Sequence, residues 1–317
     1  MSASFRIAFL LLILLFGKRS VCFSQTDTTY IKKHPQEFSL KAYTIFESVS
    51  ILHEYGNLEK ITSKYGSNRP LGLGLGVSYR NIGLSFSYSI KPFRDANKGD
   101  TKSVDWQYHY YGKNIVFDFI GQMYEGFYTT EIGEDREISY NFHSRLKVTK
   151  LGFSSQYVFN SKKFSYRAAF DQSERQLQSA GSFLLGGEFY YNQIRSDIPY
   201  FFNDTIGGKE KHKSYQFGPN VGYAHTFVIK KQVHISLSLS AGFNLGINHD
   251  DNSFMFCPTT LPRVGIGYNA DNWSFGISYL NNLTYTYFTG NRKIALNTGQ
   301  ALMTFTKRFF SGKLKVG

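Results

Sequence analysis

The polar side chains best suited to chemistry gather in one short stretch of this sequence, residues 167 to 178. An arginine there offers planar N–H donors that fit a carboxylate or a phosphate in bidentate fashion. Ser173 has no histidine near it in the sequence to activate it as a nucleophile. We therefore predict no catalytic residues and a candidate ligand-binding cluster of Arg167, Asp171, Ser173, Glu174, Arg175 and Gln178. The alternative is a set of ion pairs that only stiffens the protein interior.

The sequence lacks the spacings that are typical of metal and cofactor sites. Its eight histidines form no His-x-His or His-Glu-x-x-His pattern. The acidic stretch 248–252 lacks the twelve-residue ligand order of a calcium loop and is typical of a solvated turn. Residues 71–76 alternate leucine and glycine, but a period of two with no helix after it does not fit a phosphate-binding loop. We expect no metal and no cofactor.

The N-terminus has the pattern of a secretory signal peptide. Arg6 precedes an unbroken apolar run from Ile7 to Phe16, which is too short for a membrane-spanning helix of about 20 residues. Small residues at the −3 and −1 positions predict cleavage near Ser24/Gln25; a membrane anchor is the alternative. Cleavage removes three basic residues and lowers the formal net charge from +13 to +10. Cys257 is then the only cysteine, so no intramolecular disulfide can form.

Long alternating strands are the elements that must position the polar cluster. In residues 233–248 every second residue is apolar and every partner is polar or glycine. This period of two places one face in an apolar medium and the other in water. The run is longer than the five or six residues of most globular strands. A tilted transmembrane strand needs about 9 to 11 residues and commonly extends beyond the bilayer.

The same alternation recurs along most of the chain and predicts a barrel. It is found at 71–79, 82–90, 217–229, 264–268 and 273–287. The apolar parity changes at Arg80-Asn81, which predicts a hairpin tip. Because lipid offers no partner to unpaired backbone groups, strands that face it must close on themselves. We predict an all-β fold, a transmembrane up-and-down antiparallel β-barrel of 12 to 14 strands after an N-terminal signal peptide.

The connections between the strands have two lengths, which also favours an outer-membrane barrel. Tight turns are expected at 80–81, 111–114, 160–163, 229–232 and 269–272. Longer polar loops are expected at 57–68, 94–102, 129–145, 195–213 and 249–259. In such barrels the short turns face the periplasm and the long loops face outward.

One segment interrupts the alternation, and it contains the polar cluster. The strands that begin after Lys163 and at Ser182 both run outward by parity, so residues 173–181 must bring the chain back. These residues include a single large apolar side chain and do not fit a lipid-facing strand. Either the segment returns inside the lumen as a small plug or hairpin, or its flanks merge into one bent strand. An extra strand around 198–204 is a third solution.

The strand pattern sets the expected domain boundaries. Residues 1–24 are the predicted signal peptide, 25–37 a short periplasmic segment, 38–310 the β-barrel domain and 311–317 a C-terminal tail. Phe305, Phe309 and Phe310 end the last strand. A terminal strand that ends in aromatic residues resembles the recognition signal of outer-membrane barrel assembly, so we expect the barrel-assembly machinery to be a partner.

Three stretches carry a resemblance to a known family. They are LGLGLGVSYRNIGLSFSYS (71–89), DWQYHYYGKN with the following GFY (105–128), and YVFNSKKFSYRAAFDQSERQLQSAGSFLLGG (157–187). Over most of the mature chain the sequence resembles an uncharacterised family from Bacteroidota, domain of unknown function 4421. The resemblance implies a Gram-negative, exported protein of outer-membrane type and supplies no chemistry.

The excess of basic residues favours lipid partners over nucleic acid. The 36 lysines and arginines are dispersed along the chain rather than gathered on one element, so we expect no nucleic-acid binding. Several cap the predicted short turns, where outer-membrane lipids and lipopolysaccharide supply counter-charges. We therefore expect localisation in the cell outer membrane; the sequence does not fix the oligomeric state.

Three functions fit these features. The preferred one is passive permeation or binding of a small polar ligand. The alternative is an accessory or docking protein that acts through the predicted loops 129–145 and 195–213. The third is a lipid-modifying barrel enzyme, in which a serine, a histidine and an acid would have to meet near one rim of the lipid-facing wall.

Overall fold

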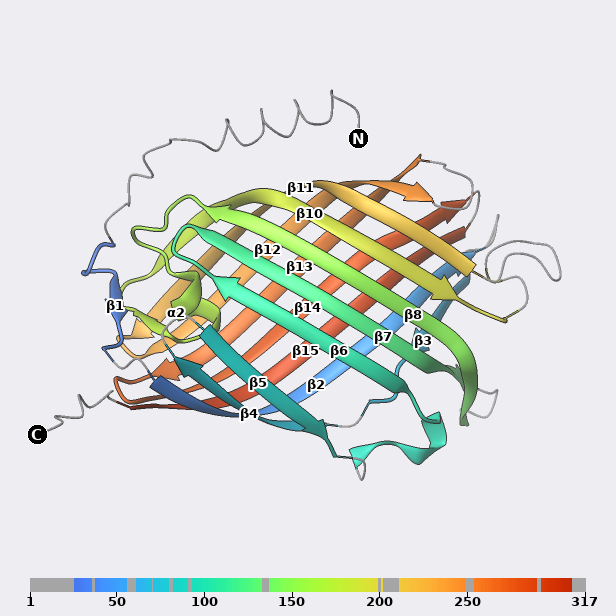
Figure 1. Ribbon diagram of the computed structural model, residues 1–317, viewed down its shortest axis with the longest axis horizontal. Coiled ribbons are helices and arrows are strands. Elements are labelled where there is room, and N and C mark those ends of the chain that lie inside the picture. The colour runs from blue at the N-terminus through green and yellow to red at the C-terminus, as the bar shows by residue number, and fades with distance from the viewer. Residues whose placement is uncertain are drawn as a thin grey trace, which may run out of the picture.

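The computed structural model describes residues 26–35, 38–55, 61–69, 71–79, 82–90, 93–132, 137–198, 201, 211–248, 254–289 and 292–309 (Figure 1). The predicted signal peptide, the hairpin tip Arg80-Asn81, Phe310 and the tail 311–317 lie outside these ranges, as does most of the proposed extra strand at 198–204. Within them, none of the helices has the length and apolar character needed to cross a membrane.

Long antiparallel strands make up most of the described chain. Most of the predicted strand regions are confirmed, and the strand at 233–248 has the predicted bounds. The wall strands are β2 (Phe38–Tyr55), β3 (Ile61–Gly66), β4 (Gly72–Tyr79), β5 (Ile82–Ser89), β6 (Lys102–Tyr111), β7 (Ile115–Ile132), β8 (Ile138–Val158), β10 (Ala180–Arg195), β11 (Lys211–Lys230), β12 (Val233–Asn248), β13 (Phe254–Asn269), β14 (Trp273–Thr289) and β15 (Arg292–Phe309).

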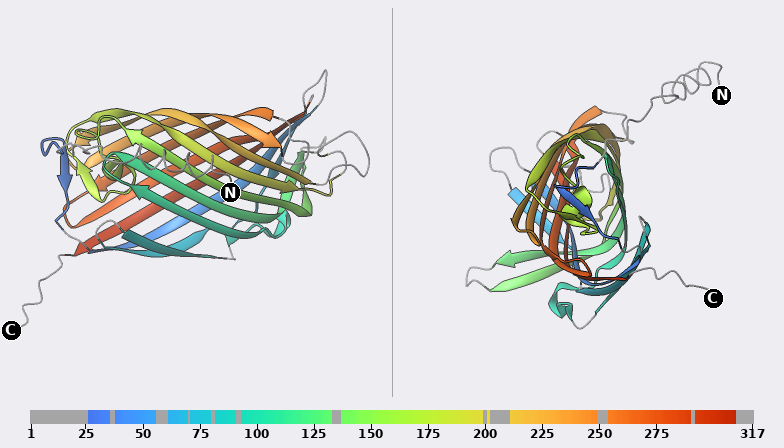
Figure 2. Two further views of the ribbon diagram at one scale, coloured as in Figure 1. Left: turned by 45° about the horizontal axis from the view of Figure 1, so that its top comes forward. Right: turned by 90° about the vertical axis from the view of Figure 1, so that its left-hand side faces the viewer.

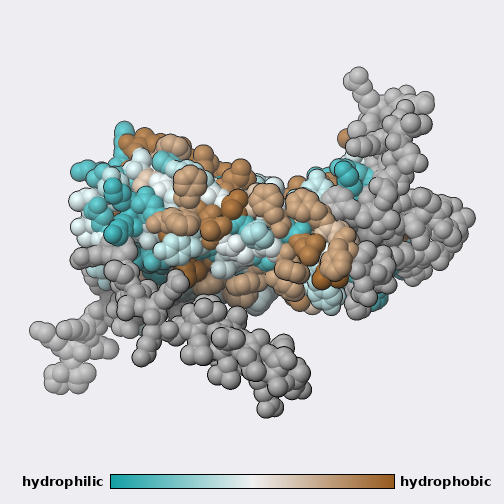
Figure 3. Space-filling view, turned by 90° about the horizontal axis from the view of Figure 1, so that it is seen from above, coloured by the Kyte–Doolittle hydropathy of each residue, from teal (hydrophilic) through white to brown (hydrophobic). Residues whose placement is uncertain are grey.

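The barrel has an apolar exterior and a polar interior. On β12 the side chains of Leu239 and Phe243 are 59% and 50% exposed, whereas Ser240 and Asn244 are 5% and 0% exposed. Figure 3 shows hydrophobic residues along the side of the barrel and hydrophilic residues at the end near β1. A water-soluble protein would bury these apolar side chains. The reversed arrangement is that of a transmembrane barrel.

Ten of these strands form a closed ring. β15 pairs with β2 along its whole length, from Lys293↔Glu54 to Phe309↔Phe38. The ring then runs in the order β15, β14, β13, β12, β11, β10, β8, β7, β3 and back to β2. The pairing of β3 with β7 consists of one residue pair, Gly66↔Tyr128. The ring is therefore closed, but the junction between β3 and β7 consists of a single residue pair.

The ring holds fewer strands than the predicted 12 to 14 because residues 57–68 are not simply a loop. They contain β3, which pairs with the C-terminal part of β2, Ser50–Tyr55, and reaches β7. The N-terminal part of β2, Phe38–Ile45, pairs with β4 instead. β4, β5 and β6 consequently extend the wall without being part of the ten-strand ring. The predicted loop 129–145 is also largely strand, since β7 continues to Ile132 and β8 begins at Ile138.

A β-bulge redirects β7 where its neighbour changes. Below the bulge, β7 pairs with β6 from Val116 to Glu125. The register with β8 shifts between Glu125 and Phe127, and Gly126 has a φ of +87°. A Cβ at Gly126 would lie 2.8 Å from the Asp100 carbonyl oxygen. Glycine is needed there because the bulge combines a positive φ with a close backbone approach.

The segment between β8 and β10 forms a plug in one end of the barrel. It contains the short helix α2 (Tyr166–Phe170) and the strand β9 (Glu174–Gln176). β9 pairs with β1 (Ile31–Lys33), which comes from the N-terminal segment. The end-on view in Figure 2 shows α2 and β1 inside the outline of the barrel. The predicted strand after Lys163 is wrong, because these residues form α2. The predicted return of the chain inside the lumen as a small plug agrees with the position of the segment before β10, which begins at Ala180.

Candidate functional site

Local sequence explains why the plug folds and stays in place. Ser165 caps α2, because its Oγ accepts a hydrogen bond from the Ala168 N–H at 3.1 Å. The buried face of the segment, Phe164, Tyr166 and Ala169, packs against barrel residues such as Val116, Val158, Leu184 and Ala224. Small residues on that face allow the helix to lie close to the wall. The polar side chains of the segment are left on its other faces.

The plug and the wall enclose a cavity of about 510 Å³. This volume lies within the range of about 300–1,000 Å³ that is usual for small-ligand pockets. Of the predicted cluster, Arg167, Asp171 and Ser173 line it. Lys41 and Tyr43 of β2 also line the cavity.

Asp171 and Lys41 form the accessible ion pair of this cavity. The Lys41 Nζ lies 3.3 Å from the Asp171 Oδ1, and the two side chains are 31% and 38% exposed. Burial pushes the pKa of Asp171 upward, but Lys41 and a hydrogen bond from Ser173 hold it below its usual value. The carboxylate is therefore charged at neutral pH. A ligand that enters the cavity meets a cation and an anion side by side.

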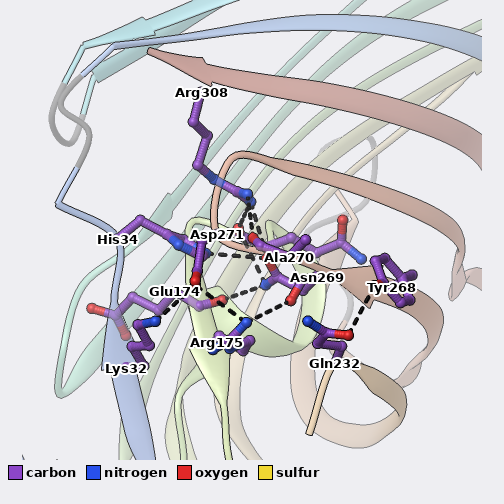
Figure 4. A network of polar contacts seen from close by, with 11 residues as sticks. Lys32, His34, Glu174, Arg175, Gln232, Tyr268, Asn269, Ala270, Asp271 and Arg308 are labelled. Carbon is purple, nitrogen blue, oxygen red and sulfur yellow. Dashed lines mark hydrogen bonds and ion pairs between the residues drawn. The ribbon is translucent and has the colours of Figure 1, made fainter. Parts of the chain in front are cut away.

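Two of the other predicted residues, Glu174 and Arg175, lie in a network at the mouth of the barrel (Figure 4). Glu174 accepts a hydrogen bond from the Ser165 Oγ at 2.6 Å. The Arg175 Nη1 lies 3.3 Å from the Asp271 Oδ1, which also pairs with the Lys32 Nζ at 2.7 Å. Gln178 is exposed and donates to the Thr29 carbonyl oxygen. The Arg167 Nη1 lies 3.8 Å from the Glu174 Oε1, so one ion pair links the cavity residues to the mouth of the barrel, although Glu174, Arg175 and Gln178 do not line the cavity themselves.

The mouth network fastens the N-terminal segment to the barrel. The His34 Nε2 and the Asn269 Oδ1 are 3.1 Å apart. Burial, followed by the nearby Arg308, lowers the pKa of His34 to about 4. Arg308 donates to the carbonyl oxygens of Gln172 and Ala270 and to the Ser274 hydroxyl. His34 is therefore neutral at physiological pH, because burial and Arg308 outweigh the hydrogen bond to Asn269, which favours the charged imidazole.

A buried charge network on the barrel wall was missed by sequence reasoning. Arg263 on β13 donates to Asp118 on β7, and the two side chains are 4% and 5% exposed. His109 Nδ1 lies 2.6 Å from the other Asp118 oxygen, and the Tyr111 hydroxyl accepts from Arg263 at 2.9 Å. The alternation of the strands could have identified these residues, since each of the charged groups occupies an inward-facing position of an alternating strand.

Beyond the cavity the lumen is filled by buried polar side chains. Lys150 is 0% exposed, and its Nζ donates to Asn282 at 2.6 Å and to Thr284 at 3.0 Å. Glu188 accepts from Asn244 at 2.7 Å and from Thr259. Lys150 on β8 reaches β14 on the opposite side of the ring, whereas Glu188 on β10 reaches the nearer strands β12 and β13. Buried polar side chains can fill an interior in the same way as apolar side chains when their hydrogen-bonding groups have partners.

An apolar cluster fills the lumen nearer the other end. It contains Val49, Ile51, Tyr65, Tyr124, Phe127, Leu146, Val148, Ile194, Phe201, Ile294 and Leu296. These residues come from β2, β3, β7, β8, β10 and β15, with Phe201 added from the chain after β10. Among the described residues, the cavity is therefore closed on its inner side by a polar layer and then by an apolar one.

The described residues hold no group of three or more histidine, cysteine, aspartate or glutamate side chains that could bind a metal ion. Cys257 is a free, buried thiol. The cavity is lined by charged side chains, hydroxyl groups and aromatic rings.

A comparison with known protein families identifies the family of this chain. The model of the family described as domain of unknown function (DUF4421) matches residues 25–305. The chain belongs to this family. The predicted resemblance is confirmed, and the match covers the plug and nearly all of the barrel of this DUF4421 protein. A search of curated proteins finds no match.

Solved structures of outer-membrane proteins are similar to this DUF4421 protein in fold only. Outer-membrane expressed OmpT of Vibrio cholerae has 8% identity and a TM-score of 0.30, over 85% of this chain and 98% of that one. A structure titled bacterial polysaccharide outer membrane secretin has 12% identity and a TM-score of 0.35, over 86% and 99%. A Pseudomonas aeruginosa FadL homologue has 9% identity and a TM-score of 0.28, over 86% and 90%. Values this low leave the function of this chain open.

Proposed function

We propose that this protein is an outer-membrane β-barrel that binds a small polar ligand in its luminal cavity. The observation that carries this proposal is the Lys41–Asp171 pair, which is accessible from a cavity of suitable size. A ligand with both a cationic and an anionic group matches such a pair. Its anionic group can pair with Lys41 and its cationic group with Asp171, so that neither side chain is left as a buried, unpaired charge. Residues of both signs line the rest of the cavity, including Arg167, Glu47 and Asp105.

Binding explains the interior better than steady permeation does. A permeation path would have to pass Lys150 and its partners, which are fully buried and hydrogen-bonded across the lumen. Removing these side chains from their partners would leave charged and polar groups unsatisfied. In the cavity, in contrast, a ligand has to replace only the contact between the partly exposed Lys41 and Asp171 side chains.

The remaining features of the proposal follow from the sequence. Residues 1–24 act as a signal peptide, and the mature protein lies in the cell outer membrane, where lipids and lipopolysaccharide surround it. The barrel-assembly machinery inserts it.

Tryptophan fluorescence tests ligand binding directly. Trp106 lines the cavity, and Trp273→Phe leaves it as the only tryptophan. We expect glycerophosphoethanolamine, a water-soluble zwitterion, to give a saturable change in Trp106 emission. Lys41→Ala and Asp171→Asn should each weaken the affinity by about tenfold, equivalent to about 1.4 kcal/mol. Lys32→Ala, which breaks an ion pair outside the cavity, is the matched control. No saturable signal, or equal effects of all three variants, would overturn the proposal.

Planar-bilayer recording separates binding from permeation. We expect the inserted wild-type protein to give no steady conductance steps. Regular ohmic steps from a preparation that shows the heat-modifiable gel migration of a folded barrel would favour permeation as the function instead.

A further inference from the structure

The barrel wall is interrupted between β5 and β6. β5 pairs with β4 on one side, and β6 pairs with β7 on one side. Within the described chain, no residue pair joins β5 to β6, although they follow each other along the wall. Figure 1 shows the two ribbons separated along their length. We call this unpaired boundary the β5/β6 seam.

The connection between the two strands explains why they do not pair. The Asn68 Nδ2 donates to the carbonyl oxygens of Asp95 and Gly99 at 2.7 Å each, which holds this connection beside the end of β3. Thr101 donates to the Gly126 carbonyl oxygen at 2.8 Å and fixes the start of β6 against β7. Lys98 lies over the rings of Tyr128 and Tyr140. These contacts hold β6 beside β7 and away from β5.

The cavity reaches this seam. Ser87 of β5 and residues Asp105 to His109 of β6 line it. β6 contributes five consecutive residues, whereas β2 and β15 contribute only alternate residues and β4 and β14 contribute runs of three. A paired strand presents every second side chain to the lumen. Five in succession, including the outward-facing Trp106, indicate that the cavity passes around the free edge of β6.

The seam has an apolar rim and a polar interior. Outside, Phe86 and Tyr88 of β5 are 74% and 67% exposed, and Trp106 of β6 is 58% exposed. Inside, the Tyr43 side chain hydrogen-bonds to Ser87, and Gly74 makes room for its ring, since a Cβ there would lie 2.1 Å from it. The Gln107 Oε1 atom is buried and has no hydrogen-bond partner. A molecule in the seam thus meets aromatic rings first and polar groups after them.

Unpaired strand edges are unfavourable in the hydrocarbon core of a bilayer, which offers no hydrogen-bond partner to their backbone groups. Each unsatisfied N–H or C=O group in the bilayer core costs several kcal/mol. The free edges of β5 and β6 therefore need polar atoms beside them. An amphipathic molecule supplies these atoms with its head group while its apolar chains remain in the surrounding lipid.

We infer that the β5/β6 seam is a lateral entrance, and that the ligand of the luminal cavity is the zwitterionic head group of a membrane lipid that enters from the bilayer. The Lys41–Asp171 pair receives the two charges, and Phe86, Tyr88 and Trp106 contact the upper part of the acyl chains. This inference rests on the proposed binding function and adds to it the class of ligand and the route.

Bridging the seam tests the route. In a Cys257→Ser background, Ser87→Cys and Gln107→Cys are joined by bifunctional maleimides of graded length. The matched control joins Ser278→Cys to Leu302→Cys, which are register partners on the paired strands β14 and β15 and also line the cavity. Heat-modifiable migration on gels confirms that each variant is folded.

The readout is photolabelling of the interior from the membrane. Vesicles contain phosphatidylethanolamine with a diazirine near the carboxyl end of one chain, and adducts on the inward-facing Lys41 and Tyr43 are measured by mass spectrometry. We expect the seam bridge to reduce these adducts by about tenfold and the control bridge to leave them unchanged. Adducts on the outward-facing Phe183, which is 70% exposed, should stay constant in both.

A soluble probe separates this inference from the proposed function. Glycerophosphoethanolamine binding to the seam-bridged protein should persist if the cavity is also reached from water at the plugged end. If the soluble probe binds but the seam bridge leaves interior labelling unchanged, the lateral route is wrong and the binding function stands. If neither the soluble probe nor the lipid reaches Lys41 and Tyr43, both are wrong.

Discussion

The two sides of this barrel are built differently. From β7 to β15 the wall strands are 16 to 21 residues long. β10 and β11, for example, pair continuously over their length from Ala180↔Thr226 to Arg195↔Lys211. On the other side β3, β4, β5 and β6 have 6 to 10 residues, a single-pair junction and an unpaired seam.

The interior follows the same division. Beside the long strands, buried groups such as Lys150, Glu188 and Asn220 find partners on other wall strands. Beside the short strands lies the cavity. Opposed wall strands supply side chains that satisfy one another, so a continuous wall packs its lumen. Where the wall is short, the plug has to fill the space and leaves part of it open.

The largest expected effect comes from the charge network of the continuous wall. Arg263→Leu leaves the Asp118 carboxylate buried without its cationic partner. We expect a loss of about 3–5 kcal/mol in the free energy of unfolding, measured by denaturant titration in detergent micelles. Lys41→Ala removes half of the accessible pair at the cavity and should cost about 1 kcal/mol or less. Equal losses would mean that the two regions do not differ as described.

A pair of adjacent glycines tests the packing of the same wall. A Cβ at Gly186 would lie 1.7 Å from the Ser155 carbonyl oxygen, so the β8 backbone would have to move. Gly186→Ala should cost about 1–3 kcal/mol of unfolding free energy. At Gly187 the nearest atom is the Gly218 carbonyl oxygen at 3.5 Å, so Gly187→Ala is the control and should be tolerated. A reversed order would contradict the observed register.

The mouth network predicts a smaller, pH-dependent effect. The pKa of His34 is lowered to about 4 when the N-terminal segment is docked and is about 6.5 when it is free. As the pH falls from 6.5 toward 4, the free segment binds a proton that the docked segment does not, so docking weakens. Hydrogen exchange of residues 26–35 should increase at pH 5 relative to pH 7.5, after correction for intrinsic rates. His34→Gln should abolish this difference, and its persistence in that variant would assign it to another group.

The smallest effect is expected at the surface of the same network. The Lys32 and Asp271 side chains are 40% and 56% exposed. Lys32→Ala should reduce the protection of residues 26–35 by about 1 kcal/mol or less, and high salt should remove the difference between variant and wild type. A salt-independent loss would show that Lys32 acts through packing.

The candidate site was only partly predictable. Arg167, Asp171 and Ser173 were identified as part of an unusually polar segment, and they do line the cavity. Lys41, which pairs with Asp171, is more than 100 residues earlier in the chain and carries no local signal. Glu174 and Arg175 are close to them in sequence but do not line the cavity. β9 pairs with β1, the Glu174 side chain contacts Ser165 and Arg167, and the Arg175 side chain is turned toward Asp271.

The sequence by itself determined which residues face outward, because a strand has a period of two and each side chain responds to its own surroundings. The wall strand Val233–Asn248 could be delimited to the residue for that reason. The tertiary structure alone decided the pairing of strands: that β2 divides between β3 and β4, that ten strands close the ring, and that β5 and β6 stay apart. Backbone hydrogen bonds are nearly independent of side-chain identity, so alternation cannot specify a neighbour. Contacts far along the chain, such as those of Asn68 and Gly126, make that choice.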